Sequence, residues 1–328
     1  MPSRRLVVLS LGAGLAAPSV LRARTTPVDA LRAAAGGLDQ LRAILVQRGG
    51  ALRLAEAIRG PGLDRVANIK SCSKSLVALI LGTAIDRGEI AGIGARLGDV
   101  APDLIPADAT PGVADLTMED LVTLRAGLEG TSGPRYGAWV ASGNWVAEAL
   151  RRPRLAPAGG PMIYSTGTTH VLGAALATAT GRTLLSLMRE RLGAPLGIEI
   201  PAWTRDPQGF YFGGNEMALT PRAMLRVAVM LRDGGRFEGR AVVPSSWVAA
   251  SRTARTRSPY SGLGYGYGWF VSPGGWTLAR GFGGQVIAAH PGRGLAVAIT
   301  SDPTRAARSE GYFGDLMRLL DGPVLALA

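Results

Sequence analysis

The feature that most constrains the fold is a continuous apolar segment from Ser71 to Ile85, which Gly88 follows. Its large apolar residues face every side of a helix and not a single stripe: Leu76, Val77, Leu79, Ile80, Leu81 and Ile85. A helix that is apolar all round needs protein on every side, and glycine is a common stop signal after a helix. We therefore expect a buried helix here, at the centre of the fold.

The rest of the chain can supply that surrounding core. It has 328 residues, of which 47% are hydrophobic and only 18% are charged. This is enough for one or two packed domains and argues against disorder. Cys72 is the single cysteine, so there is no internal disulfide, and stability must come from packing.

The first 24 residues predict an export signal. Arg4 and Arg5 precede an apolar run from Leu6 to Leu21, and small residues near Ala23 suit a signal peptidase. The arginine pair also resembles a twin-arginine signal, which implies delivery to a bacterial periplasm. Residues 25–328 would then form one domain with no stable membrane span, since the run is short for one. The alternative is an ordinary amphipathic N-terminal extension.

The net charge of +12 invites a nucleic-acid interpretation. Removing Arg4, Arg5, Arg22 and Arg24 with the signal lowers it to +8. The other basic residues are scattered among acidic ones, without a basic patch interleaved with aromatics. We expect a solvated basic surface and no nucleic-acid partner.

Secondary-structure signals divide the chain into three parts. Residues 30–43 have helical periodicity, and residues 43–58 form a hairpin around Gly49-Gly50. Residues 97–204 carry helix signals without strand alternation, with helices opening at Thr117 and Asn144 and a longer helical region at 171–192. The last third alternates strands and turns, at 264–271, 276–280, 285–289 and 295–300, before a final helix around 312–320.

These parts predict an α+β fold: one antiparallel sheet built from both chain ends, flanked by helices, with a helical lobe inserted and a cleft between. The sequence contains no repeat, no glycine-rich phosphate loop after a strand and no Cys/His metal spacing. We expect no metal and no cofactor.

Lysine marks the candidate site. Of the 36 basic residues only Lys70 and Lys74 are lysines, and both lie beside Ser71. Arginine cannot lose its proton in a protein, whereas a desolvated lysine can become a base. Three residues apart at a helix start, Ser71 and Lys74 project from the same side, and the helix dipole and burial both disfavour the ammonium. The alternative is two chance lysines at a helix start.

Ser71-Cys72-Ser73-Lys74 on such a helix resembles the S-x-x-K serine hydrolases, most closely the class C β-lactamase branch of esterases, D-aminopeptidases and aminohexanoate-oligomer hydrolases. Segments 68–70, 84–88 and 121–128 look like the same branch, and the resemblance covers nearly everything after the signal. It implies a β-lactamase-like fold with Ser71 as nucleophile and Lys74 as its base.

The resemblance extends to a second and a third motif. Tyr164-Ser165-Thr166 matches a tyrosine that shuttles protons, with Thr166 in place of the usual Asn. Gly281-Phe282-Gly283-Gly284-Gln285 matches a cleft-edge strand where Lys or His is usual, and Phe282 stands at that position. The resemblance implies that the Gln285 backbone N–H joins that of Ser71 as the oxyanion hole. The alternative is a glycine-rich hairpin turn.

The remaining polar candidates favour structure over chemistry. His170 and His290 have no companion acid at a recognisable spacing, which argues against a Ser-His-Asp arrangement. Cys72 is interpreted as a small apolar side chain inside the helix. Gly213-Gly214 weakly resembles a turn that lines the cleft in this family.

The sequence thus predicts a serine hydrolase that cleaves a small ester or amide through an acyl-enzyme. Loss of the third-motif cation favours an esterase or short-amide hydrolase. The alternatives are a β-lactamase or D-amino-acid peptidase acting on cell-wall-like substrates, and a non-catalytic relative that binds peptidoglycan or a partner. Substrate identity and oligomeric state are left open.

Overall fold

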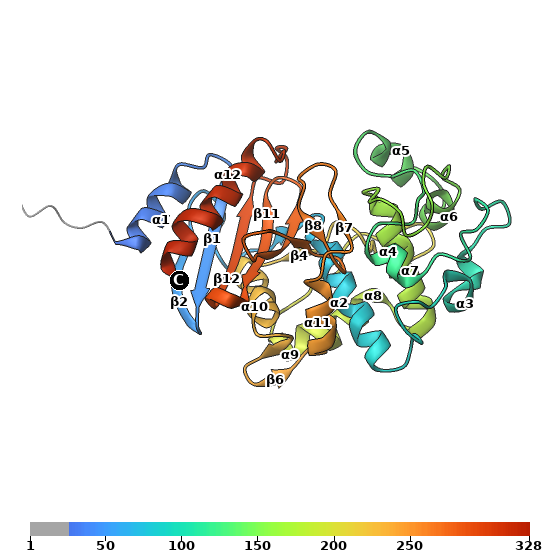
Figure 1. Cartoon of the computed structure of the whole chain (residues 1–328), viewed down its shortest axis with the longest axis horizontal. Coiled ribbons are helices and arrows are strands. Elements are labelled where there is room, and N and C mark those ends of the chain that lie inside the picture. The colour runs from blue at the N-terminus through green and yellow to red at the C-terminus, as the bar shows by residue number, and fades with distance from the viewer. Residues whose placement is uncertain (1–25) are drawn as a thin grey trace, which may run out of the picture.

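The centre of the computed structural model is an eight-stranded antiparallel sheet, and the structure describes residues 26–328. The predicted export signal, residues 1–24, lies outside the described residues. β1 pairs with β12 near one edge of the sheet, with Ala43 opposite Thr300 and Arg48 opposite Leu295. The sheet is therefore built from both ends of the chain, as expected, and the α+β fold is confirmed (Figure 1). In spatial order the strands are β2 (Ala51–Ala57), β1 (Leu41–Arg48), β12 (Leu295–Ser301), β11 (Gln285–His290), β10 (Thr277–Gly281), β9 (Phe270–Val271), β8 (Gly264–Tyr265) and β7 (Thr256–Arg257).

Both faces of the sheet are buried, and each packs against its own apolar core. Successive side chains of a strand point to opposite faces, so neighbouring residues enter different cores. In β1, Ile44 and Val46 pack into one apolar core while Leu45 packs into the other. In β11, Val286 and Ile287 divide in the same way. This explains why these strands are almost continuously apolar in sequence.

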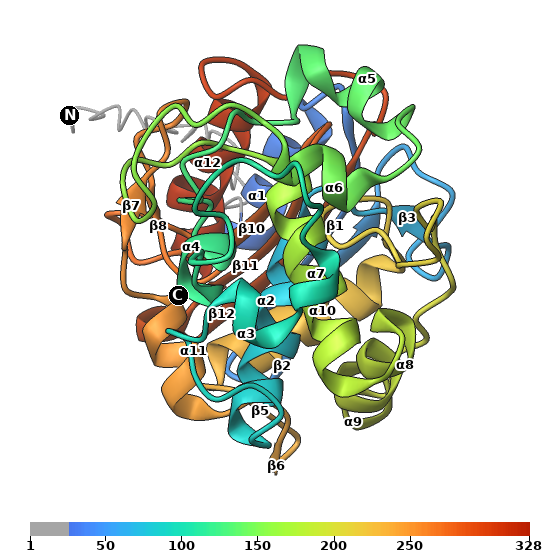
Figure 2. The same ribbon diagram turned by 90° about the vertical axis from the view of Figure 1, so that its right-hand side faces the viewer.

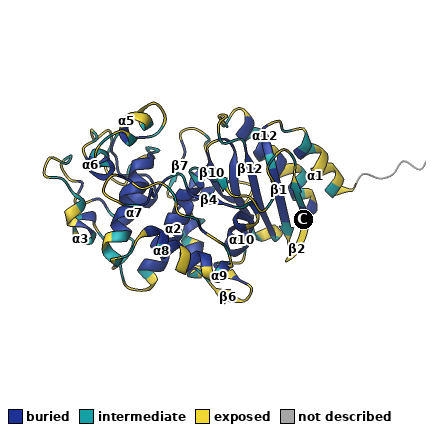
Figure 3. Cartoon of the chain, turned by 180° about the vertical axis from the view of Figure 1, so that it is seen from behind, coloured by how far each residue is buried: buried dark blue, intermediate teal, exposed yellow. Residues whose placement is uncertain are grey.

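Helices from distant parts of the chain cover the two faces. One face carries α1 (Pro27–Gly36), α12 (Tyr312–Leu319) and the turns η5 (Leu320–Val324) and η6 (Leu325–Leu327), which pack into a common core. The other carries α2 (Cys72–Asp86), α10 (Pro221–Arg232) and α11 (Ser245–Ser251). Every residue of α2 from Cys72 to Ala84 is buried, so the expected central helix is confirmed (Figure 3).

Residues 97–204 are mostly helical, as predicted, and the helices between residues 97 and 180 form a lobe beside the sheet (Figure 1). Thr117 and Asn144 cap the helices that they were expected to open, Thr117 in a capping box with Asp120. Isolated bridges occur in this range, but no strand is found in it. Its elements are α3 (Leu97–Val100), η1 (Pro102–Leu104), α4 (Met118–Val122), η2 (Gly133–Arg135), α5 (Tyr136–Val140), α6 (Trp145–Leu150), α7 (Thr166–Thr180), α8 (Leu184–Met188), η3 (Arg189–Gly193) and α9 (Ala194–Leu196).

Smaller elements complete the fold. Two two-stranded ribbons pair β3 (Ala67–Asn68) with β4 (Ala218–Leu219) and β5 (Arg236–Phe237) with β6 (Arg240–Ala241), and η4 (Pro291–Arg293) joins β11 to β12. In the described part of the chain, no single helix has both the length and the apolarity to cross a membrane. The bent pair Thr166–Thr180 and Leu184–Leu196 meets the criteria together, by length and composition only.

Some helix assignments differ from expectation, and α1 and α10 show why. The helix expected at 30–43 begins earlier and ends at Gly36, because Thr26 caps it, Pro27 suits its first turn, and Leu41 already pairs with Ser301 in the sheet. Helix α10 was not predicted, although Thr220 caps it and Pro221 opens it. It packs on β1, β11 and β12 and supplies much of the core that it shares with α2.

Candidate active site

Ser71 lies where α2 begins and lines a cleft between the sheet and the lobe, and Lys74 follows it one turn along the helix. Lys74 Nζ lies 3.0 Å from Ser71 Oγ. The residue before Ser71, Lys70, has a φ of 51°, a left-handed conformation that is costly for a side chain with a Cβ. Lys70 is held there by its contacts, because its N–H donates to Asn68 and its Nζ pairs with Glu216 at 3.1 Å. The chain thus enters α2 through a fixed elbow that presents Ser71.

Lys74 has a different environment from Lys70, which pairs with Glu216. Lys74 is only 3% exposed, and burial lowers its pKa to about 7. Its Nζ also donates to Thr166 Oγ1 at 3.2 Å and to the Gly214 carbonyl at 2.6 Å. These three contacts use its hydrogen-bonding capacity without any carboxylate. Such an amine can be neutral near pH 7 and accept a proton from Ser71.

Tyr164 lies next to this pair, just before α7. Its ring centre is 5.1 Å from Lys74 Nζ. Burial raises the Tyr164 pKa, and this effect is countered by a hydrogen bond with Ser71 and by the charge of Arg280. Helices α2 and α7 are neighbours, which brings the first and second motifs together (Figure 2). The phenol stays protonated near neutral pH and can give a proton.

Thr166 belongs to a network of hydroxyl groups at the start of α7. Its Oγ1 lies 2.9 Å from Ser132 Oγ, and its N–H donates to the same oxygen at 2.9 Å. Ser165 caps α7 through Thr168 N–H and also accepts from Thr131 N–H. The wall opposite the sheet is therefore fixed by short polar contacts between two chain segments.

The third motif forms a tight turn between β10 and β11. Phe282 is 52% exposed and lines the cleft together with Gly281. Gly283, Gly284 and Gln285 are buried and do not line it. Gly283 and Gly284 have φ values of 80° and 93°, which favour glycine, so the glycine-rich hairpin turn describes their geometry well.

Gln285 has contacts within the sheet. Its Nε2 donates to the Ser301 carbonyl at 2.9 Å, and its Oε1 accepts from Ser301 N–H at 3.1 Å. Its own carbonyl accepts from the Cys72 thiol at 3.4 Å. The side chain thereby ties β11 to β12, and its carbonyl ties β11 to the start of α2. The structure brings Ser71, Tyr164, Thr166 and Phe282 around one cleft, with Lys74 and Gln285 behind its lining.

The cleft has a volume of about 790 Å³. Its charged groups are mostly paired, since Lys70 contacts Glu216 and Arg135 contacts Glu129 at 2.8 Å. Arg280 is different: it donates to Ser309 and Ala307 and stacks 3.6 Å from the Phe313 ring centre. Burial lowers the Arg280 pKa to about 10, an effect that the neighbouring Tyr164 oxygen partly counters.

Sequence reasoning missed several site residues, among them Asn215, Glu216 and the acid that pairs with His170. His170 Nε2 lies 2.9 Å from Asp206 Oδ2, an acid that no recognisable spacing in the sequence had marked. The two are 36 residues apart, and no local spacing could have revealed the pair. Neither His170 nor His290 lines the cleft, and His290 contacts the Gly274 carbonyl instead.

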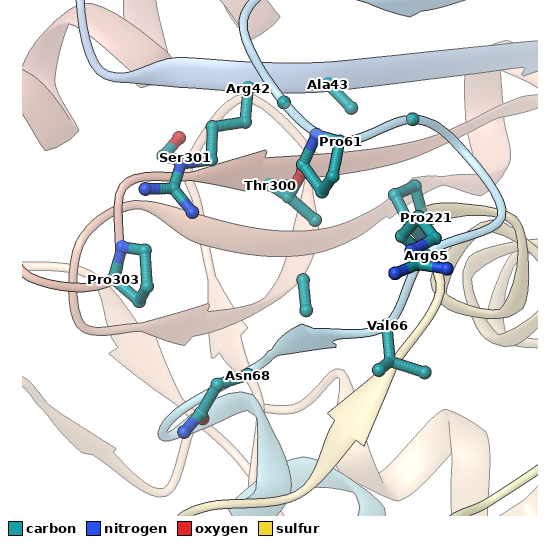
Figure 4. A pocket seen from close by; sticks show the side chains of 13 residues that line it. Arg42, Ala43, Pro61, Arg65, Val66, Asn68, Pro221, Thr300, Ser301 and Pro303 are labelled. Atoms are coloured by element: carbon teal, nitrogen blue, oxygen red, sulfur yellow. The ribbon is translucent and has the colours of Figure 1, made fainter.

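A second, smaller pocket of about 130 Å³ lies between the β2–β3 connection and the ends of β1 and β12 (Figure 4). Arg42 and Arg65 lie on opposite sides of it, and Arg42 is paired with Asp302 at 3.3 Å. Among residues 26–328, no group of three or more His, Cys, Asp or Glu residues is placed to hold a metal ion.

Comparisons with known proteins agree with this fold. The Beta-lactamase family model matches residues 42–310. No curated protein sequence matches the chain. Similar solved structures include "Putative 6-aminohexanoate-dimer hydrolase from Bacillus anthracis", with a TM-score of 0.76 and 17% identity over 88% of this chain and 80% of that one. They also include "EstCE1, a hydrolase with promiscuous acyltransferase activity", with a TM-score of 0.74 and 18% identity over 91% and 97%. A third is a penicillin-binding protein homologue from Caulobacter crescentus, with a TM-score of 0.69 and 19% identity over 84% and 91%. At these identities the structures show a shared fold.

Proposed function

The chain belongs to the Beta-lactamase family of serine hydrolases, and from this premise we propose that it cleaves small esters or amides through an acyl-enzyme on Ser71. The observation that carries the proposal is the 3.0 Å contact between Ser71 Oγ and the amine of Lys74, whose pKa burial lowers to about 7. A base must be unprotonated at working pH and within hydrogen-bond reach of the proton that it takes.

The reaction has two halves. Ser71 Oγ attacks the substrate carbonyl while Lys74 takes its proton, and Tyr164 gives a proton to the leaving alcohol or amine as the carbonyl–leaving-group bond breaks. Water then attacks the ester formed on Ser71, with proton transfers in the reverse sense, and releases the acid. Backbone N–H groups at the start of α2 can stabilise the oxyanion.

A labelling experiment tests this function. A fluorophosphonate probe should add mass to the intact protein, and digestion should place the label on the peptide that contains Ser71. Ser71→Ala should abolish both the label and the hydrolysis of nitrophenyl acetate. A label that persists in Ser71→Ala would contradict the proposal, and so would an unlabelled wild type, which the non-catalytic alternative predicts.

We expect esters to be better substrates than β-lactams, because an exposed Phe282 stands where relatives carry a cation. Arg280 favours the alternative of a β-lactamase or D-amino-acid peptidase, because it lines the cleft without a carboxylate partner in the described structure. Paired kinetics with nitrophenyl butyrate and nitrocefin decide between them. If nitrocefin matches the ester in kcat/KM, and Arg280→Met removes that activity alone, the alternative is correct.

A further inference from the structure

A buried acid and imidazole lie behind the cleft, outside its lining. His170 is on α7, Asp206 is in the loop before β4, and both side chains are fully inaccessible to solvent. Three aromatic rings surround the imidazole, at 5.9, 5.5 and 5.7 Å between ring centres: Trp139, Trp145 and Phe212. Burying an ionised carboxylate costs free energy unless its oxygens accept hydrogen bonds. An apolar residue would fill the same space without that cost, so packing alone does not explain the pair.

The hydrogen bonds fix the tautomer of His170. Gly213 N–H points at His170 Nδ1 from 3.3 Å, so Nδ1 must be the acceptor. The ring proton is then on Nε2 and is donated to Asp206 Oδ2 at 2.9 Å. Asp206 Oδ1 accepts from Gln208 N–H at 2.9 Å and from Phe210 N–H at 2.8 Å. Asp206 is thus an oriented acceptor that keeps the imidazole in the form able to hold Gly213.

The turn that His170 holds continues directly to Lys74. The Gly214 carbonyl accepts from Lys74 Nζ at 2.6 Å, the shortest of the three contacts of that amine. The turn lies flat on α7: a Cβ on Gly213 would lie 2.6 Å from the Thr169 carbonyl, and one on Gly214 would lie 2.7 Å from the Thr166 carbonyl. Only a bare backbone fits, so the position of Gly214 depends on how Gly213 is anchored.

We propose that His170 and Asp206 are positioning residues for Lys74, which hold Gly213 and thereby aim the Gly214 carbonyl that orients Nζ toward Ser71. This inference rests on the proposed role of Lys74 as base. The titratable groups that face Lys74 are Cys72 on α2 and Tyr164 before α7. Neither of them contacts His170 or Asp206. Among the described residues, His170 is the one titratable side chain that bonds to Asp206.

Asp206→Asn provides an isosteric test. Oδ1 would keep its two backbone donors, so the new amide NH₂ would point at His170 Nε2 and force the ring proton onto Nδ1. Nδ1–H would then oppose Gly213 N–H. The sequence has only two histidines, so the ¹⁵N spectrum of histidine-labelled protein contains two imidazoles, and His290→Asn assigns them. We expect the Nε2–H form of His170 in the wild type and the Nδ1–H form in Asp206→Asn. An unchanged tautomer would overturn the proposal.

Kinetics test the link to Lys74. Because misplacing a catalytic group by about 1 Å can cost about 10²-fold in rate, we expect Asp206→Asn to lower kcat by roughly 10 to 100-fold with KM changed less than about threefold. A displaced Gly214 carbonyl stabilises the ammonium less, so the acid limb of kcat/KM should move to lower pH. A purely structural role would reduce the amount of folded enzyme without moving that limb.

Two His170 variants guard against a folding defect. His170→Asn keeps an acceptor for Gly213 N–H, whereas His170→Leu does not, and both lose the contact with Asp206. We expect His170→Asn to retain kcat at least about fivefold above His170→Leu at similar Tm. Equal kcat values would overturn the proposal.

Glu89→Gln serves as the matched control. It weakens a partly buried ion pair away from the cleft, between the buried Arg191 and the half-buried Glu89 at 2.6 Å. It should lower Tm without moving the pH limb. Serine labelling of the wild type separates the proposed function from the positioning role. If Ser71 carries no label, the proposed function fails. If Ser71 is labelled but the Asp206 and His170 variants keep the wild-type kcat and pH limb, the positioning role alone is refuted.

Discussion

The two walls of the cleft are built in opposite ways. The helical wall, made of Tyr164 and Thr166 with the buried Gly213–Gly214 turn behind them, is fixed through several short polar contacts. The sheet wall, made of Arg280, Gly281 and Phe282, presents an exposed aromatic ring and one cation without a carboxylate partner in the described structure. The groups that hold Lys74 are all on the helical wall or on α2.

This difference separates two tasks. Proton transfer requires groups placed to within a few tenths of an ångström, and buried hydrogen-bond networks supply that precision. Substrate choice tolerates a looser surface, because apolar contact depends on area more than on direction. We therefore expect changes in the helical wall to lower kcat for every substrate, and changes in the sheet wall to alter the preference among substrates.

The largest effect should come from the amine itself. Lys74→Arg keeps the positive charge and the helix propensity, but arginine does not deprotonate and is bulkier. We expect both Lys74→Arg and Lys74→Ala to lower kcat/KM for nitrophenyl acetate by about 10³-fold or more. If Lys74→Arg retains more than a tenth of wild-type activity, the role of Lys74 is electrostatic and another base must exist.

The pH dependence of the wild type should show the same amine. Since burial lowers the Lys74 pKa to about 7, kcat/KM should rise with pH to a plateau above a midpoint near 7. Below the midpoint the ammonium form is inactive, so activity at pH 5 should be about 10²-fold lower than on the plateau, at one factor of ten per pH unit. A stopped-flow profile with a neutral ester checks this. A midpoint below pH 5 would assign the limb to a carboxylate.

Thr166→Val gives a smaller effect on the same wall. It keeps the shape of the side chain but removes the hydroxyl that contacts both Lys74 and Ser132. Loss of such a contact is worth roughly 1–1.5 kcal/mol, which corresponds to about tenfold in kcat. The loss should be equal for esters and amides. An effect confined to one substrate would place Thr166 in substrate binding instead.

Phe282 on the sheet wall should give the smallest effect on esters. Phe282→Ala and Phe282→His should change kcat/KM for nitrophenyl acetate by less than about threefold, because the ring is half exposed and contributes little buried area. Phe282→His should raise nitrocefin turnover, since an imidazole can meet the substrate carboxylate. No change with nitrocefin would show that this position does not decide β-lactam activity.

The sequence by itself determined the central helix, most of the sheet strands and the spacing of Ser71 and Lys74. The apolar pattern of 71–85 required a central helix, and three-residue spacing put Ser71 and Lys74 on one side of it. Hairpin and strand signals gave the sheet, since these depend on contacts between near neighbours. Tyr164 came from resemblance to a family, not from its own surroundings in the chain.

Only the tertiary structure decided what surrounds Lys74. Gly214 is 140 residues from Lys74 in sequence, and Asp206 is 36 from His170. Neither contact leaves a local pattern, because it arises when separate segments pack together. Likewise, Arg280 lies two residues before Phe282 on the same edge of the cleft, but its contacts with Ser309 and Phe313 depend on how the chain after β12 folds back over β10. Periodicity fixes which face a residue occupies, and packing fixes what it meets there.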